Sequence, residues 1–485
     1  MKRTFQMASL ALLVSVSTTM AQEPVDLDMV SRIREEGLNR SQVMQVFDQF
    51  VVVFGPRLTA TPACNAAAEW AREKLAEWGL SNSHLESWEF GRGWTLEDFS
   101  IEMLKPRYLP IIGYPRAWSP STQGMLTGAP VMLAGLSTDE LSEYQGKLRS
   151  SIVMTRPIES RFIREDREPP ILNPPRGFKD DLNRQQGSAR RALATLVRNE
   201  NAGVTLEPSR GEHGTMFVLG RDSGDEAVPS VVVAAEHYNT IARLLERGIE
   251  VELAVEVRSK FHETDTNGYN VIAEIPGTDP LIGDEVVMVG AHYDSWHSSP
   301  GAADNADGCA VVMEAARILM ELGVKPRRTI RFALWGAEEE GLLGSREYVE
   351  RHLAGDDNSE ARDRFSIYFN LDPGGGPIYG FFLEGNEAIR PIFEAYLQPF
   401  EDMGAANLTM EGIGSTDHVP FIRAGVPGFQ AIHDFVDYDV KIHHTNMDTY
   451  ERIREEDLKQ ASVVMASMLY HSAMRDQKMP RADNR

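Results

Sequence analysis

The sequence predicts an α/β fold, a mixed central sheet flanked by helices, with an inserted β-rich domain. Three observations predict it. The chain has 485 residues and is 42% hydrophobic, which is typical of a globular protein but too long for one ordinary core. From about residue 269 to 474, apolar strands alternate with amphipathic helices, as in sheets covered by helices. Between about residues 126 and 260, short β-rich runs replace this alternation and indicate a separate unit.

The N-terminal residues are typical of a secretory signal peptide. Lys2 and Arg3 precede an apolar run over 7–16, and small residues follow up to Ala21. The run is too short to span a bilayer comfortably, and no later stretch resembles a transmembrane helix. We therefore expect an exported protein, periplasmic or secreted, that leaves the membrane after cleavage. The sequence indicates no particular oligomeric state.

These patterns divide the chain into five expected parts. They are the signal peptide (1–21), the first part of the main domain (22–125), the inserted domain (126–262), the second part of the main domain (263–478) and a tail (479–485). Helical spacing of apolar residues predicts helices over about 25–79, and a strand follows near 84–90. In the insertion we expect one helix over 189–199, after a charged, proline-rich loop over 157–186.

Polar side chains follow three apolar strands of the main domain. The strands are expected at 286–290, 330–335 and 366–371. His292 and Asp294 come after the first, Glu338 and Glu339 after the second, and Asp372 after the third. Because ligands bind at the carboxyl ends of strands in open α/β sheets, we expect these side chains to share one edge of the sheet.

Two further segments supply similar side chains. A glycine-bounded loop over 301–308 carries Asp304 and leads into an apolar helix, and a polar loop near the end carries His443 and His444. Each segment alone has an ordinary structural explanation, such as a helix cap or a surface loop. Their occurrence together in one half of the chain favours a shared metal site.

Composition excludes several classes of function. A formal net charge of −23 disfavours binding to nucleic acid or to anionic membranes. Cys64 and Cys309 lie in no CxxC pair, which excludes a thiolate zinc site, and we expect both to be buried free thiols. The absence of a G-x-S-x-G motif disfavours a serine hydrolase of the α/β type.

The five segments together resemble the co-catalytic zinc peptidases of the M28 family. The resemblance extends over about 271–450 and implies the zinc exopeptidase fold. The insertion resembles the protease-associated domain of several members. Gly55-Pro56-Arg57-Leu58 and Ser295-Trp296 are similar to the carboxypeptidase Q-like branch. The chain departs from the family pattern at Asp307, where a serine is usual.

The resemblance implies two Zn²⁺ ions per chain and a role for each residue. Asp304 would bridge the ions, His292 and Asp372 would complete one, and Glu339 and His444 would complete the other. Glu338 would be the general base, and Asp294 would orient His292.

The chemistry of these groups agrees with that allotment. Imidazole and carboxylate ligands suit Zn²⁺. Zinc lowers the pKa of bound water toward about 7 and polarises a peptide carbonyl. A carboxylate that binds no metal must still accept the proton and pass it to the leaving amine. With this chemistry, the resemblance implies hydrolysis of terminal bonds in peptides or dipeptides, from either the amino or the carboxyl end.

Two alternatives use the same fold. One is a single-zinc glutaminyl cyclase, an aminoacyltransferase, which the number of bound metal ions would distinguish. The other is a non-catalytic, receptor-like relative, which would have lost ligands that this sequence retains.

Overall fold

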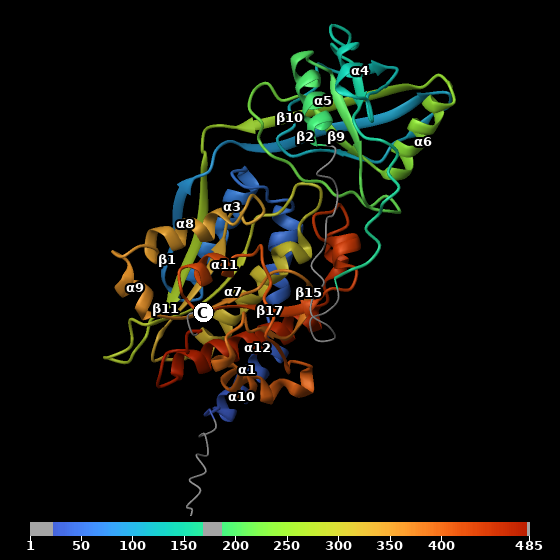
Figure 1. The fold of residues 1–485 in the computed structure, drawn as a ribbon. Helices are drawn as coiled ribbons and strands as arrows, with labels where there is room; N and C mark the ends of the chain where they lie inside the picture. The colour runs from blue at the N-terminus through green and yellow to red at the C-terminus, as the bar shows by residue number, and fades with distance from the viewer. Residues whose placement is uncertain (1–22, 168–186, 483–485) are drawn as a thin grey trace, which may run out of the picture.

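The computed structural model describes residues 23–167 and 187–482, and the predicted signal peptide lies outside these ranges. The predicted loop over 157–186 and the predicted tail are described only in part. One large sheet with its helices and a second unit of two smaller sheets make up the molecule (Figure 1). No helix among the described residues combines the length and apolar character needed to cross a bilayer.

The large sheet has eight strands and is mixed, as predicted. Its order is β1 (Ser81–Glu89), β11 (Asn267–Ile275), β13 (Thr329–Trp335), β12 (Val286–His292), β14 (Phe365–Asn370), β17 (Gly428–Asp434), β15 (Gly375–Phe382) and β16 (Asn407–Thr409). The four central strands β13, β12, β14 and β17 are parallel to one another. Parallel strands end at the same edge, which gives the sheet one edge where several strand ends meet.

Helices cover both faces of this sheet. One face packs against α1 (Leu27–Asn39), α2 (Val43–Asp48), α3 (Pro62–Glu77), α7 (Asp307–Glu321), α10 (Arg390–Leu397) and α12 (Glu455–Met474). The other packs against α8 (Leu343–His352) and α11 (His418–Arg423), with α9 (Ser359–Arg364) beside β14. Along β12, Val287 and Val289 enter the first core, and Val286 and Met288 enter the second. Because side chains alternate along a strand, an unbroken apolar run is required where both faces are buried.

The second unit consists of two small sheets packed face to face. One has the order β3 (Leu109–Pro110), β2 (Gly93–Lys105), β10 (Glu252–His262) and β5 (Leu126–Gly128). The other has the order β4 (Gly113–Pro115), β9 (Ser230–Val233), β8 (Val204–Pro208), β7 (Ile152–Met154) and β6 (Val131–Met132). Leu253 and Val255 of the first sheet share a buried core with Val204 and Leu206 of the second.

The described residues of this unit include three helices, although the sequence predicted only one. They are α4 (Thr138–Ser142), α5 (Gly187–Asn199) and α6 (Ala235–Glu246). Tyr238, Ile241 and Ala242 of α6 enter the core between the sheets, and their three- and four-residue spacing is the signal that identifies this helix.

Two antiparallel strand pairs connect the units. Strand β1 pairs with β11 in the large sheet, and the next strands along the chain, β2 and β10, pair in the small one. The small sheets therefore begin at Gly93, before the predicted start of the insertion at residue 126, because β2 lies beside β10. The domain boundaries themselves stay predictions.

Both cysteines are buried and free, as predicted. The Cys309 thiol donates to the backbone oxygen of His292 at 3.0 Å, which places it beneath the end of β12.

Candidate metal centre

The parallel strands bring two of the expected side chains to one point. His292 is the last residue of β12, and Asp372 follows the end of its neighbour β14. Nε2 of His292 lies 3.5 Å from Oδ1 of Asp372 and 3.2 Å from Oδ1 of Asp304. All three residues are buried. The three donor atoms lie within 4.8 Å of one another, which is close enough to bind one cation.

The loop before α7 places Asp304 between the other groups. The carboxylate of Asp448 accepts the backbone N–H groups of Ala303 at 2.8 Å and of Asp304 at 3.1 Å. The side-chain amide of Asn305 donates to the backbone oxygen of Leu371 at 2.8 Å. These bonds fix the Asp304 backbone against β14 on one side and the 443–449 loop on the other.

His444 and Glu339 form a second group on the other side of Asp304. Nε2 of His444 lies 2.8 Å from Oε2 of Glu339 and 3.7 Å from Oδ2 of Asp304. The same Glu339 oxygen accepts the indole N–H of Trp296 at 2.7 Å. Asp304 thus directs one carboxylate oxygen toward His292 and the other toward His444.

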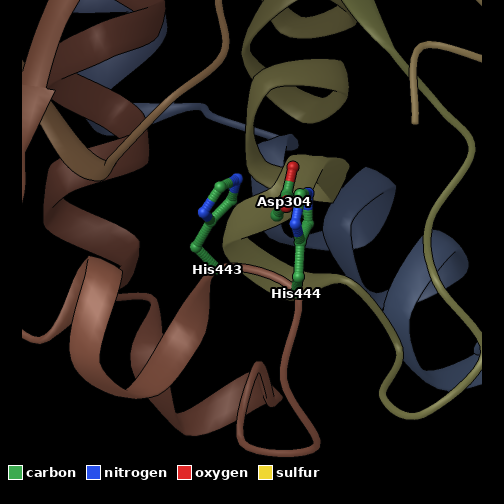
Figure 2. A group of neighbouring side chains, drawn as sticks. All are labelled: Asp304, His443 and His444. Carbon is green, nitrogen blue, oxygen red and sulfur yellow. Dashed lines mark ion pairs between the residues drawn. The ribbon is translucent and has the colours of Figure 1, made fainter. Parts of the chain in front are cut away.

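His443 also lies in this group, although the sequence favoured only His444. Figure 2 shows both imidazoles extending from adjacent positions of one loop toward Asp304. Donor atoms of Asp304, His443 and His444 lie within 4.8 Å of one another. The ring of His443 is also stacked on Tyr438, with 5.2 Å between the centroids. The signal for His443 in the sequence is only its position beside His444.

Two buried polar atoms at the centre lack hydrogen-bond partners within 23–167 and 187–482. They are Nε2 of His292 and Oδ2 of Asp304. Buried polar atoms almost always have a partner, and unpaired ones commonly face an ion or a water molecule. Both atoms belong to the side chains whose chemistry suits Zn²⁺. The residues present therefore fit a metal centre.

Asp294 connects two of the strand ends. Its carboxylate accepts the backbone N–H groups of Glu338 and Glu339, each at 3.2 Å. Nδ1 of His292 lies 3.1 Å from the backbone oxygen of Asp294 and 3.6 Å from Oδ1. Donation from Nδ1 leaves Nε2 free as an electron-pair donor, which is how metal-binding imidazoles are usually oriented.

The ionisable groups at the centre shift one another's pKa. Burial and the nearby Asp304 raise the pKa of Glu339 to about 7. Burial lowers the pKa of His444, but Glu339 and Asp304 outweigh this effect and raise it to about 9. Burial and the charge of Asp372 raise the pKa of Glu338. A divalent cation would oppose these shifts, because it binds neutral imidazoles and ionised carboxylates and releases their protons.

The buried Arg57 holds the loops beside the centre. Its guanidinium donates to the backbone oxygens of Tyr293 (2.7 Å), Pro300 (2.7 Å) and Gly301 (3.2 Å). These oxygens lie at the two ends of the segment between β12 and the Asp304 loop. The sequence identified Arg57 only through a family resemblance, and the structure provides a physical role for it.

The centre borders a cavity of about 600 Å³ between the two units. His443 and His444 line one part of it, and residues of the β-rich unit line most of the rest. Its described lining contains the arginines Arg116, Arg156, Arg161, Arg167, Arg190 and Arg210, but only three carboxylates, Glu159, Glu207 and Asp439. A net positive lining is unusual in a chain with a net charge of −23. The described lining thus has twice as many guanidinium groups as carboxylates.

The chain is similar to known peptidases. Residues 270–469 match the model of peptidase family M28. Carboxypeptidase Q from Mus musculus is 27% identical over 436 residues, which cover 88% of this chain and 85% of that protein. Aminopeptidase YwaD from Bacillus subtilis is 36% identical over 202 residues, which cover 40% of this chain and 42% of that protein. The crystal structure of a peptidase M28 precursor from Shewanella amazonensis superposes with a TM-score of 0.72 at 25% identity, covering 94% of this chain and 99% of that one.

Proposed function

We propose that this chain, which belongs to peptidase family M28, is an exopeptidase that uses two zinc ions to hydrolyse terminal peptide bonds. The observation that carries the proposal is the position of Asp304 between two groups of donor atoms. One carboxylate shared by two donor groups is the arrangement that a pair of ions requires. A single-zinc cyclase has no need for both groups.

We assign His292 and Asp372 to one ion, Glu339 and His444 to the other, and Asp304 to both. The imidazole and carboxylate donors support zinc. The 2.8 Å contact between His444 and Glu339 supports their assignment to the same ion. Bound zinc would supply an acidified water molecule and a polarised carbonyl.

Glu338 is assigned as the general base. It is adjacent to Glu339, and the structure records no hydrogen bond or ion pair of its carboxylate with any described residue. Its raised pKa suits a group that must accept a proton and then release it. In this role Glu338 takes a proton from the attacking water and transfers it to the leaving amine. Asp294 holds the backbone of this segment and the ring of His292, so it is a positioning residue.

The experiment that tests the proposal compares two neighbouring glutamates. Glu338→Gln should lower kcat by about 10²- to 10⁴-fold while both zinc ions remain bound, because only proton transfer is lost. Glu339→Gln should lower kcat and, in addition, lose bound zinc. Glu347→Gln, at an exposed position of α8, should change neither kcat nor zinc content. Zinc content by mass spectrometry and dipeptide hydrolysis are the measurements. A wild-type protein with one zinc ion and no hydrolysis would instead support cyclase chemistry.

The arginine-lined cavity favours substrates with a carboxylate near the cleaved bond. Glu207 is shared by Arg116 and Arg156, and Asp439 is paired with Arg167. Arg161 has no ion-pair partner among the described residues, and its side chain is exposed. We propose that guanidinium groups of this cavity bind the free carboxyl end of a peptide or dipeptide, as a carboxypeptidase or dipeptidase requires.

Blocking the carboxylate tests this preference. A dipeptide with a free carboxyl end should be cleaved with a higher kcat/KM than its amide. Arg161→Gln should reduce the difference about 10- to 150-fold, since a charge-assisted hydrogen bond contributes about 1.5–3 kcal/mol. Arg164→Gln is the matched control, because Arg164 pairs with Glu212 and does not line the cavity. Preferred cleavage of aminoacyl anilides would identify an aminopeptidase instead.

Export and peptide substrates complete the proposal. The signal-like first 21 residues support a periplasmic or secreted enzyme, and the family supports peptides as substrates. N-terminal sequencing of the protein from its native host should give a mature chain that begins after Ala21.

A further inference from the structure

The loop that carries His444 has a strained backbone. It follows β17 and precedes α12, so it lies outside the regular elements of the large sheet. His444 itself has φ +62°, in the left-handed region. A residue with a Cβ pays about 1–2 kcal/mol for this conformation and keeps it only when its surroundings hold it there. The side chain of His444 contacts Glu339 of the main unit, whereas its backbone oxygen is bound by the β-rich unit.

The first contact with that unit is a backbone bridge at His444 and Asn446, on the two sides of Thr445. The N–H of Val218 donates to the backbone oxygen of His444 at 3.1 Å, and the N–H of Asn446 donates to the backbone oxygen of Met216 at 3.1 Å. The side-chain oxygen of Asn446 also accepts the N–H of Met216 at 2.8 Å. Phe217 and Thr445 are therefore paired like residues of two antiparallel strands.

The segment 216–218 is itself fixed within the β-rich unit. Met216 and Val218 are fully buried in a cluster with Val232 and Ala234, at the end of β9. The N–H of Phe217 donates to the hydroxyl oxygen of Ser209 at 3.1 Å. The backbone of His444 is therefore hydrogen-bonded to a segment that is packed against the five-stranded sheet.

The second contact is the ion pair between Arg167 and Asp439. The guanidinium of Arg167 binds both carboxylate oxygens of Asp439, at 2.8 and 2.5 Å, and its backbone N–H adds a third bond at 2.7 Å. The guanidinium also lies over the ring of Tyr438, 5.4 Å from its centroid. Tyr438 stacks on His443, and the rings of His443 and His444 are 3.7 Å apart. A continuous series of contacts therefore connects Arg167 to the two imidazoles.

We propose that the β-rich unit positions the His444 side of the metal centre through the 216–218 segment and Arg167. The inference rests on the two-zinc function proposed above and assigns the unit a role in it. Neither the segment nor Arg167 contributes a metal ligand in that assignment, so both act through His444. Affinity for one of the two ions then depends on residues that do not touch it.

Substitutions of Arg167 test this role. Arg167→Gln should weaken binding of one zinc ion about 10- to 100-fold, the usual effect of losing a group that orients a ligand, and should leave the other ion unchanged. Arg167→Lys should restore part of the affinity, because it keeps the charge but loses the bidentate geometry. Arg164→Gln, three residues earlier and paired with Glu212, should have no effect. Zinc affinities are measured by chelator competition.

A second measurement needs no metal. In metal-free protein, hydrogen–deuterium exchange over 435–447 should be faster in Arg167→Gln than in wild type, with no change in β12 or β14. Asp439→Asn removes the same ion pair with an isosteric side chain and should give the same result if Arg167→Gln folds poorly.

The outcomes separate this inference from the proposed function. If wild type binds two ions and Arg167→Gln binds both equally well, or loses both to the same extent, the positioning role is wrong. Unchanged exchange over 435–447 would also contradict it. A wild-type protein that binds fewer than two zinc ions contradicts the two-zinc function, and the exchange experiment still decides the role of Arg167.

Discussion

His292 ends a buried strand of the large sheet, whereas His444 lies in a loop at the border with the β-rich unit. The side chain of His292 is 0% exposed, and that of His444 is 25% exposed. His292 has Asp304 and Asp372 beside it within the main unit. The backbone of His444 is held by Val218 of the other unit. One side of the centre is thus part of a protein core, and the other depends on how two units meet.

The difference shows how a single chain can support ligands in two ways. The packing of the whole sheet determines where a strand end lies, and this packing contributes to the free energy of folding. A loop is placed by a few specific contacts and can open without global unfolding. Changes on the His292 side should therefore affect stability and zinc binding together, whereas changes on the His444 side should affect mainly zinc binding.

The largest effect is expected where the two sides meet. Asp304→Asn should abolish binding of both ions and reduce hydrolysis to background, because the amide that replaces one carboxylate oxygen is a poor ligand for zinc. In wild type, zinc at 100 times its Kd should stabilise the folded protein by about 2.7 kcal/mol for a bound ion, and this gain should vanish in the variant. Zinc content and melting temperature with and without zinc are measured together. Retention of one tightly bound ion would show that Asp304 belongs to one side only.

A smaller but more selective effect should distinguish the two histidines. His292→Ala should destabilise the metal-free protein by about 2 kcal/mol or more, because it leaves a buried cavity next to carboxylates. His444→Ala should change the stability of the metal-free protein by less than about 1 kcal/mol, since the side chain of His444 is partly exposed. It should also lose one zinc ion, because it removes an assigned ligand. Urea unfolding in the presence of a chelator measures the free energy of unfolding of both variants. Equal losses of stability would mean that the two sides are supported alike.

The smallest effect concerns the contact between the units at His297. Its Nε2 lies 2.8 Å from the backbone oxygen of Pro115, and its ring contacts that of Trp94. Burial lowers the pKa of His297 to about 4, below the value of about 6.5 expected in the unfolded chain. The folded state thus binds fewer protons, and stability should fall as the pH drops from about 6.5 toward 4.

His297→Gln should remove this part of the pH dependence. Between pH 7 and pH 5 the variant should lose about 1–2 kcal/mol less stability than wild type. The measurement is the free energy of urea unfolding at both values. His84→Gln, on the partly exposed side chain of His84 in β1, is the control and should follow wild type. Parallel pH profiles for wild type and His297→Gln would show that His297 is not held neutral at this contact.

The sequence predicted that the polar residues after the strands, such as His292 and Asp372, lie at one edge of the sheet. The strand that ends at His292 is an unbroken apolar run over 286–291, and the strand before Asp372 contains the apolar run 367–369. Such runs are a local signal of a buried strand. It did not predict α6, whose spacing carried the necessary signal, or the earlier start of the small sheets at Gly93, which depends on β2 pairing with a strand far along the chain. Its metal-ligand and general-base assignments stay predictions.

By itself the sequence determined the mixed α/β sheet, the β-rich insertion and the set of polar residues at the strand ends, because local periodicity fixes which residues face a core and where strands stop. Only the tertiary structure decided that Asp304 lies between two donor groups, that His443 lies close to Asp304, and that Arg167 and residues 216–218 reach the same loop. These relations join residues up to 272 positions apart, and no local pattern records which distant segments the packing of two units brings together.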